Sequence, residues 1–223
     1  MRNLLVIPAF NEEPALPALI AAAKPYLNDI LVIDDGSSDS TTLVSVMSGA
    51  MTHRFAENRG KGEALKAAFE YAIGEGYDWV FTMDGDGQHV PSDLPNFLPA
   101  FEQYDLVLGN RMNDRTGIPV ARRIANYLLS LLVSAVCAKW IADSQTGFRA
   151  YSIKLLREIP LESSRYELET EVIIKAVRRG FRIGHVTIQA IYSPENRRSR
   201  NWKDLLRILR VVAKSVFWRR TLR

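Results

Sequence analysis

The chain has 223 residues, of which 47% are hydrophobic and 24% are charged. These proportions exclude a wholly disordered chain, a collagen-like chain and a multi-span membrane protein, and the length favours one domain over residues 1–223. The formal net charge of +4 is unevenly distributed, because residues 197–223 hold ten basic side chains and one acidic one, or +9, whereas the remaining residues carry −5.

Both the amino-terminal region and the cysteine content favour a cytoplasmic location. The first residues, MRNLLVIPAFNEE, contain a short apolar run that Pro8 and two acids interrupt, so they predict a strand and not a signal peptide. The single cysteine, Cys137, cannot form an internal disulfide, which suits a reducing compartment. The longest apolar stretch, residues 127–138, has 12 residues, fewer than the ~20 that a spanning helix requires. We therefore expect no membrane-spanning segment.

Short apolar runs recur along the chain, and polar turn residues follow each of them. Strands are predicted at residues 4–8, 30–34, 78–84 and 105–109, with a further segment at 51–56. Helices are predicted between them at residues 13–24, 62–74 and 92–102. Strands that alternate with helices predict an α/β fold with a mostly parallel central sheet flanked by helices. Because ligands bind beyond the carboxyl ends of such strands, the turns after them form the candidate site.

Asp84 and Asp86 follow the third of these strands and carry the sharpest chemical signal. Two converging carboxylates repel one another unless a cation lies between them, and hard oxygen ligands suit Mg²⁺ or Mn²⁺ that also holds phosphates. Gln88 could add a third oxygen. For the acidic pair taken alone, the alternative is a turn in which an aspartate caps the next helix.

A second polar turn, DDGSSD at 34–39, also follows a strand directly. An acid at this point can hydrogen-bond ribose hydroxyls or a base edge, while the glycine and serines let the backbone turn closely round a nucleotide. An ordinary loop that caps a helix through Asp39 or Ser40 is an equal alternative. The glycine turn NRGKG at 58–62 indicates a phosphate loop only weakly, because neither GxxxxGK[ST] nor GxGxxG is present.

Together these segments resemble the nucleotide-sugar glycosyltransferases of family 2, and within that family the dolichyl- or polyprenyl-phosphate sugar synthases. The matching segments are VIPAFNEE at 6–13, VIDDGSSDST at 32–41, NRGKG at 58–62, MDGDGQH at 83–89, GNR at 109–111 and DSQTGFRAY at 143–151. They occur in order over about the whole chain. The resemblance implies a GT-A-type, Rossmann-like domain that transfers a sugar, with inversion, from GDP-mannose or a UDP-sugar to polyprenyl or dolichyl phosphate.

The resemblance also implies roles for individual residues. The nucleotide-sugar-binding residues would be Pro8, Phe10, Glu12, Ile33, Asp35, Asp84, Gly85 and Asp86. Asp84, Asp86 and Gln88 would hold the diphosphate through Mg²⁺ or Mn²⁺, which neutralises the charge that develops on the leaving nucleoside diphosphate. Metal-dependent transfer is therefore expected.

Arginines are the candidates for holding an acceptor phosphate, because guanidinium groups bind phosphate oxygens in bidentate fashion. The expected set is Arg111, Arg123, Arg198 and Arg200, although the chain lacks the Gly-x-Ser-Lys pattern common in such synthases near residues 192–203. A phosphate monoester, with a second pKa of about 6, is largely dianionic at neutral pH and needs no strong base.

The alternative is a transferase of the same fold with a soluble or saccharide acceptor. A sugar hydroxyl would need a carboxylate base, for which Asp143 is best placed, with Glu169 and Glu171 also available. The expected catalytic residues are therefore Asp86, Asp143 and Arg111.

The carboxyl-terminal region, from about residue 200 to 223, predicts a basic amphipathic helix. Four basic residues recur at steps of three and four, and Leu and Val residues are available to another face; the basic set is Lys203, Arg207, Arg210 and Lys214. Such a helix suits an anionic membrane surface, and a helix packed on the domain is an equal alternative. In residues 124–141, three polar residues at steps of four leave a wide apolar face for the membrane or for the core; they are Asn126, Ser130 and Ser134.

We therefore expect peripheral association with the cytoplasmic face of the membrane, with which a separate membrane-anchoring partner is compatible. A nucleic-acid-binding module would explain the isoelectric point of about 9.2. The tail, however, is rich in Leu and Val and carries no recognised nucleic-acid motif, so no nucleic-acid partner is expected. A nucleotidyltransferase could use paired aspartates, but it would leave GNR and DSQTGFR unexplained.

Overall fold

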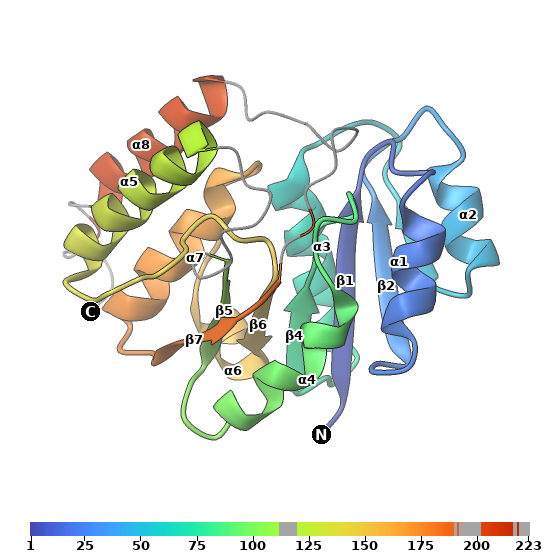
Figure 1. Cartoon of the computed structure of the whole chain (residues 1–223), viewed down its shortest axis with the longest axis horizontal. Coiled ribbons are helices and arrows are strands. Elements are labelled where there is room, and N and C mark those ends of the chain that lie inside the picture. Colours follow the sequence, from blue (N-terminus) through green and yellow to red (C-terminus); the bar gives the residue numbers. More distant parts are fainter. Residues whose placement is uncertain (112–119, 190, 192–201, 216–217, 219–223) are drawn as a thin grey trace.

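A seven-stranded sheet forms the centre of the molecule, with strand order β3-β2-β1-β4-β6-β5-β7 (Figure 1). The computed structural model describes residues 1–111, 120–189, 191, 202–215 and 218, with residues 121, 122 and 202 described by their backbone alone. The strands are β1 (Asn3–Ala9), β2 (Asp29–Asp34), β3 (Met51–Arg54), β4 (Trp79–Thr82), β5 (Leu106–Asn110), β6 (Arg149–Ser152) and β7 (Ile183–Thr187).

The sheet is mostly parallel, as predicted. Strands β3, β2, β1 and β4 pair in parallel, and so do β5 and β7. Only β6, among the described strands, runs antiparallel to its neighbours β4 and β5. The chain therefore enters β6 at the edge where β4 and β5 end, so the residues before Arg149 lie near the turns that follow those two strands.

Helices cover both faces of the sheet (Figure 1). They are α1 (Leu16–Ala23), α2 (Thr41–Met47), α3 (Lys61–Gly74), α4 (Leu94–Phe97), α5 (Val120–Cys137), α6 (Ile153–Glu158), α7 (Glu167–Arg178) and α8 (Trp202–Ser215). Successive side chains of a strand point to opposite faces, so β1 contributes to two cores. Leu4 and Val6 pack with residues of α3 and α7, whereas Leu5 and Ile7 pack with residues of α1 and α4.

The predicted elements of the first half are confirmed with shifted ends, except for the helix predicted at 92–102. That segment is a short α4 between two 3₁₀ turns, at Pro91–Asp93 and Leu98–Ala100. Pro95 and Pro99 explain the interruption, because proline has no backbone N–H to donate. The strands β6 and β7 and the helices α2, α6 and α7 were not predicted.

The serines of α5 face the protein, together with Val133 and Cys137, whereas several of its other apolar residues face outward. Ser130 is buried and its hydroxyl accepts a hydrogen bond from the backbone N–H of Ser144 at 3.0 Å. Ser134 accepts one from the N–H of Ile141 at 2.9 Å. On the other face, Ile124 is 53% exposed and Leu128 is 58% exposed. The serines thus position the segment that leads to β6, and the wide apolar face is left on the surface.

Helix α8 packs on α7 and keeps both leucines and basic residues on its outer side. Ile208, Val211 and Val212 are buried. The exposed residues include leucines and basic residues: Lys203, Leu205, Leu206, Leu209, Arg210 and Lys214. Helix α8 therefore packs on the domain and also presents a basic, partly apolar outer face, so the two alternatives for this segment do not exclude each other. Within the described residues, no helix is both long and apolar enough to cross a bilayer.

Candidate functional site

The turns that follow the strands meet at one edge of the sheet. A Cβ built on Gly85, in the turn after β4, would lie 3.3 Å from the carbonyl oxygen of Pro8 and 3.4 Å from Cγ of Glu12, both at the end of β1. A Cβ built on Gly147, just before β6, would collide with the carboxylate of Asp84. Only glycine at position 147 leaves this carboxylate its place. The segments predicted to form the site are therefore in contact.

The turns after β1 and β2 are locked together by hydrogen bonds. The backbone N–H of Asn11 donates to the hydroxyl of Ser37 at 2.9 Å, and the N–H of Ser38 donates to Oδ1 of Asn11 at 2.8 Å. The N–H of Glu12 donates to the hydroxyl of Thr41 at 2.9 Å. Asn11 has φ 54°, in the left-handed region that asparagine adopts more readily than most residues. These bonds fix the two turns as one surface.

Asp35 organises the glycine turn at 58–62. Its carboxylate accepts hydrogen bonds from the backbone N–H groups of Arg59 at 2.7 Å and Gly60 at 2.8 Å. Burial raises the pKa of Asp35, an effect that the two N–H donors partly offset. Gly36 has φ 73° and would, with a Cβ, press on the backbone of Glu57, so this close approach requires glycine. Asp35 thus connects two turns of the candidate nucleotide site.

The other residues expected to bind the nucleotide divide into two groups. Pro8 and Glu12 are partly exposed and Phe10 is 37% exposed, so these three are accessible at the end of β1. Ile33, in contrast, is 1% exposed and packs in the core. Side chains alternate along β2, and that of Ile33 packs with residues of α3, so its place in a nucleotide pocket stays a prediction.

Asp84 lies between two nitrogen groups. The ammonium of Lys61 is 2.5 Å from Oδ1 of Asp84, and Nε2 of His89 is 3.4 Å from Oδ2. Burial would raise the pKa of Asp84, but the charge of Lys61 and the contact with His89 outweigh it and hold this pKa well below its usual range. Asp84 is therefore an ionised carboxylate that is held in a fixed orientation.

Residues 84–88 form the acidic turn, and Asp86 and Gln88 are its second half. The backbone N–H of Gln88 donates to Oδ1 of Asp86 at 3.0 Å, and the Gln88 side-chain amide donates to Oδ2 at 2.8 Å. Burial and the neighbouring charge of Asp84 raise the pKa of Asp86. The carboxylates of Asp84 and Asp86 therefore repel each other.

These residues fit a hard divalent cation. Two carboxylates that repel one another, with an amide beside them, are the oxygen ligands that Mg²⁺ and Mn²⁺ prefer. Gly147 leaves room for the Asp84 carboxylate at this position. In the described part of the chain, no group of three or more His, Cys, Asp or Glu side chains gathers as a metal centre.

A buried network that was not predicted lies behind Asp84. Lys61 also donates to Oε1 of Glu169 at 2.9 Å, and Glu169 stands in the first turn of α7. The fully buried guanidinium of Arg149 donates to the backbone carbonyls of Glu169 at 2.7 Å and Ser144 at 2.9 Å. One arginine thus connects α7 with the segment before β6. In the sequence, only the position of Lys61 in the glycine turn at 58–62, after a strand, pointed to this network.

Arg111 forms a buried ion pair directly after β5. Its Nε donates to Oδ2 of Asp143 at 2.8 Å, and a terminal nitrogen donates to Oδ1 at 3.2 Å. The side chains are 9% and 0% exposed. Burial would raise the pKa of Asp143, but Arg111 and the backbone N–H of Gln145 outweigh it and lower this pKa. The structure therefore brings two predicted catalytic residues together, with Asp143 as the partner that orients Arg111.

The remaining predicted arginines are placed only in part. Arg123 is half-buried in the first turn of α5. Arg198 and Arg200 lie outside the described residues.

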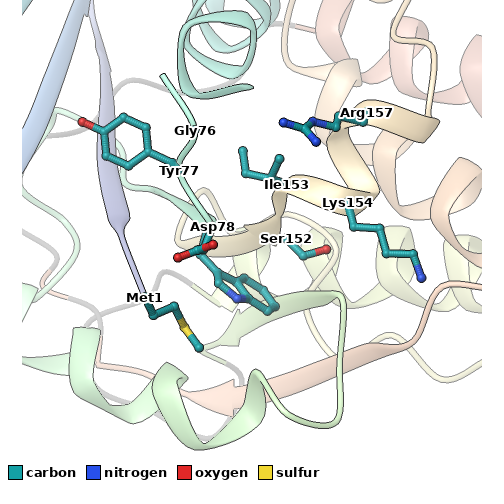
Figure 2. A pocket seen from close by; sticks show the side chains of 9 residues that line it. Met1, Gly76, Tyr77, Asp78, Ser152, Ile153, Lys154 and Arg157 are labelled. Carbon is teal, nitrogen blue, oxygen red and sulfur yellow. The ribbon is translucent and has the colours of Figure 1, made fainter. Parts of the chain in front are cut away.

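A surface pocket of about 650 Å³ lies at the opposite edge of the sheet (Figure 2). It is lined by residues at the start of β4 and the end of β6, among them Asp78, Trp79 and Ser152. Two of its polar groups have structural partners: Asp78 accepts the backbone N–H of Arg2 at 2.6 Å, and the Ser152 hydroxyl caps α6. This pocket is therefore separate from the turns that carry Asp84 and Arg111.

Comparisons with known proteins show the family of the chain. The family described as Glycosyl transferase family 2 matches residues 4–160. An undecaprenyl-phosphate mannosyltransferase of Micrococcus luteus is 32% identical over 84% of this chain and 83% of its own length. A polyprenol monophosphomannose synthase of Mycolicibacterium smegmatis is 30% identical over 84% of this chain and 76% of its own length.

The fold of the chain is similar to that of a solved structure. The glucosyl-3-phosphoglycerate synthase of Mycobacterium tuberculosis, in a crystal structure with Mn²⁺, UDP and glucosyl-3-phosphoglycerate, superposes with a TM-score of 0.76. It is 23% identical, and the match covers 98% of this chain and 79% of the synthase. At this identity, the likeness shows the shared fold.

Proposed function

Because the chain belongs to glycosyl transferase family 2, we propose that it transfers a sugar from a nucleotide sugar to polyprenyl or dolichyl phosphate. The donor would be GDP-mannose or a UDP-sugar, the whole chain would form one catalytic domain, and the anomeric configuration would be inverted. Relatives that are about 30% identical and act, by their names, on undecaprenyl or polyprenol phosphate support this acceptor class.

One observation carries the proposal. The acidic turn with Asp84 and Asp86 and the buried cation of Arg111 lie at the same edge of the sheet, because β4 and β5 both end there. A nucleoside diphosphate bound through a cation suits the first feature, and a phosphate acceptor suits the second. A sugar between them would face the cation-bound diphosphate at the turn after β4 and the acceptor phosphate at the turn after β5, two strands that flank β6.

The protein groups have distinct tasks in this reaction. Asp84 and Asp86, with Gln88, would hold Mg²⁺ or Mn²⁺, which supplies charge stabilisation for the departing nucleoside diphosphate. Arg111 would hold the acceptor phosphate, with its guanidinium orientation set by Asp143. Attack by a phosphate oxygen on the anomeric carbon forms the new bond as the bond to the diphosphate breaks, which inverts that carbon.

The state of Asp143 favours a phosphate acceptor over a sugar hydroxyl. Its oxygens accept from Arg111 and from the N–H of Gln145, and Arg111 lowers its pKa. A carboxylate with a lowered pKa is a weak proton acceptor. A phosphate dianion, in contrast, brings its own negative charge and needs no base. The saccharide-acceptor alternative with Asp143 as base therefore lacks support.

The outer faces of α5 and α8 support peripheral contact with the cytoplasmic face of the membrane. The exposed apolar side chains of α5 include Ile124, Tyr127 and Leu128. Helix α8 adds exposed leucines beside Lys203, Arg210 and Lys214, which would attract anionic lipid. The acceptor's polyprenyl chain resides in the bilayer, so this contact would place Arg111 near its substrate.

The test is a screen of nucleotide sugars with Mn²⁺ or Mg²⁺, with and without a short polyprenyl phosphate, that measures sugar transferred to the lipid phase. We expect transfer from one donor, inhibition by excess chelator, and a loss of about a hundred- to a thousandfold in kcat for Asp86→Ala. Arg111→Lys should mainly raise KM for the lipid phosphate, since lysine retains the charge and loses the bidentate geometry. Full activity of Asp86→Ala, or transfer to a saccharide alone, would contradict the proposal.

A further inference from the structure

Lys61 forms a bridge between two acidic side chains that come from distant parts of the chain. Its ammonium contacts Asp84 at 2.5 Å and Glu169 at 2.9 Å, and its side chain is 11% exposed. Glu169 is 3% exposed, and its second oxygen, Oε2, is buried without a hydrogen-bond partner among the described residues. Lys61 thus pairs with the carboxylate of Asp84, and Oε2 of Glu169 can still accept a hydrogen bond.

A divalent cation bound by Asp84 and Asp86 would have to approach the same carboxylate. Oδ1 of Asp84 already contacts the ammonium, and Oδ2 faces His89 at 3.4 Å. Two positive charges a few ångströms apart repel each other, and water weakens this repulsion only in part because the Lys61 side chain is largely buried. Lys61 and the divalent cation therefore compete for Asp84.

The surroundings of Glu169 provide a second position for the ammonium. Arg149 donates to the Glu169 backbone carbonyl, and its Nε lies 4.0 Å from Oε1 of Glu169, so the acidic residue is held in place. Lys61 is the first residue of α3, immediately after Gly60 with φ 100°, so its backbone is fixed as well. Only the end of the lysine side chain has to move from Asp84 toward Glu169.

We propose that Lys61 is an internal counter-ion for Asp84 that yields this carboxylate to the divalent cation and is then retained by Glu169. Both are positioning residues: Lys61 keeps the acidic turn assembled before the cation arrives, and Glu169 receives the displaced ammonium. The inference rests on the metal site of the proposed function and assigns the two residues that set its affinity.

The experiment measures Mn²⁺ binding, separately from activity, from the paramagnetic resonance signal of free Mn²⁺ in a titration of the full chain. Lys61→Met should bind Mn²⁺ at least about tenfold more tightly than the parent protein, because the competing charge is gone. Glu169→Gln should bind it severalfold more weakly, because the ammonium then has only Asp84 as a carboxylate partner. The two variants thus shift affinity in opposite directions.

Two further variants control for folding and for overall charge. Lys61→Met leaves the buried Glu169 and the partly exposed Asp84 without their cation. The double variant Lys61→Met/Glu169→Gln, which removes one charge of each sign, is therefore measured in parallel and should also bind Mn²⁺ more tightly. Lys66→Met removes a lysine of the same helix that pairs with Glu63 at 2.6 Å. It should leave Mn²⁺ affinity within about twofold, because its charge is more exposed and screened.

The outcomes separate this inference from the proposed function. Mn²⁺ binding that Asp86→Ala abolishes, together with unchanged affinity in Lys61→Met and in the double variant, would overturn the counter-ion role and leave the metal site standing. Mn²⁺ binding that is indifferent to Asp86→Ala, or absent from every variant, would overturn both. Opposite shifts for Lys61→Met and Glu169→Gln support the inference.

Discussion

The carboxylate of Asp84 depends on a residue that contributes no side chain. Gly147 leaves the space that this carboxylate fills, and any Cβ at that position would displace it. We therefore expect Gly147→Ala to reduce transfer at least tenfold by moving one carboxylate of the acidic turn, since positioning errors of about 1 Å cost of this order or more. The assay is steady-state transfer with the polyprenyl phosphate.

A matched control for this substitution is Gly74→Ala. A Cβ at Gly74, the last residue of α3, would meet nothing within 4 Å. This variant should keep full activity and unfold at the same or slightly higher denaturant concentration. Equal activity of the two variants would show that the place of the Asp84 carboxylate is not critical.

The ion pair of Arg111 and Asp143 gives a pH-dependent contribution to stability. Because Arg111 lowers the pKa of Asp143, this contribution is fully present above the unfolded pKa of about 3.9 and is lost as the pH falls through the folded pKa. We expect Asp143→Asn to lower the free energy of unfolding by about 3–5 kcal/mol at pH 7, because it leaves a buried guanidinium unpaired. The deficit should shrink below about pH 4.

Urea unfolding between pH 3 and pH 8 measures this difference. Asp29→Asn is the control, because Asp29 pairs with Arg2 at 3.4 Å where both side chains are more than a third exposed. The control should change the free energy of unfolding by less than about 1 kcal/mol at every pH. A deficit of Asp143→Asn that stays constant down to pH 3 would contradict a charge-dependent role.

At the scale of elements, the outward apolar face of α5 is the feature with the clearest consequence. Ile124→Gln/Leu128→Gln should weaken binding to anionic vesicles more than tenfold, since burying one such side chain contributes about 1.5–3 kcal/mol. The thermal midpoint should hardly change, because both side chains are more than half exposed. Vesicle flotation at low salt measures the binding.

The matched control lies on α2, at the other end of the sheet order. Leu43 and Met47 are 59% and 77% exposed. Leu43→Gln/Met47→Gln therefore removes an equivalent exposed apolar pair and should leave flotation unchanged. Equal loss in both double variants would mean that general surface hydrophobicity, and not α5, determines binding.

The strands that could be predicted are those with local signals. β1, β2, β4 and β5 are buried on both faces and appear as apolar runs. β6, in contrast, contains the buried Arg149, and β7 contains Gly184 and His185, so neither has the pattern of a buried strand. The antiparallel direction of β6 results from pairing with β4 and β5, which no local pattern reveals.

The candidate site was predictable to the extent that its residues follow strands directly. Asp84, Asp86 and Arg111 directly follow β4 and β5, and they lie at the carboxyl ends of these strands, as expected. The bond between Lys61 and Glu169 joins residues 108 positions apart, and Glu169 belongs to a helix that was not predicted. The burial of Ile33 could not be predicted, because its motif position does not indicate the face of the sheet on which its side chain lies.

At the scale of the whole molecule, donor binding should stabilise the fold. A nucleoside diphosphate with Mn²⁺ would connect the turns after β1, β2 and β4. At about a hundredfold excess over Kd this adds about 2.7 kcal/mol, which corresponds to about 5–10 °C in Tm for a domain of this size. Differential scanning fluorimetry with GDP or UDP measures the shift and identifies the preferred base.

The same measurement on Asp86→Ala provides the control. This variant should retain the Tm of the ligand-free parent protein and lose most of the shift produced by Mn²⁺ with the nucleotide. An equal shift in both proteins would place the nucleotide elsewhere than at the acidic turn.

The pocket at the far edge of the sheet bears on how the molecule can be labelled. Met1 and the exposed Lys154 line it, at the end of the strands opposite to Asp84 and Arg111 (Figure 2). A fluorophore attached at Met1 would leave the donor and acceptor approaches unobstructed. Energy transfer from this fluorophore to a dye in the vesicle surface would then report the orientation in which the protein docks, while sugar transfer proceeds in the same sample.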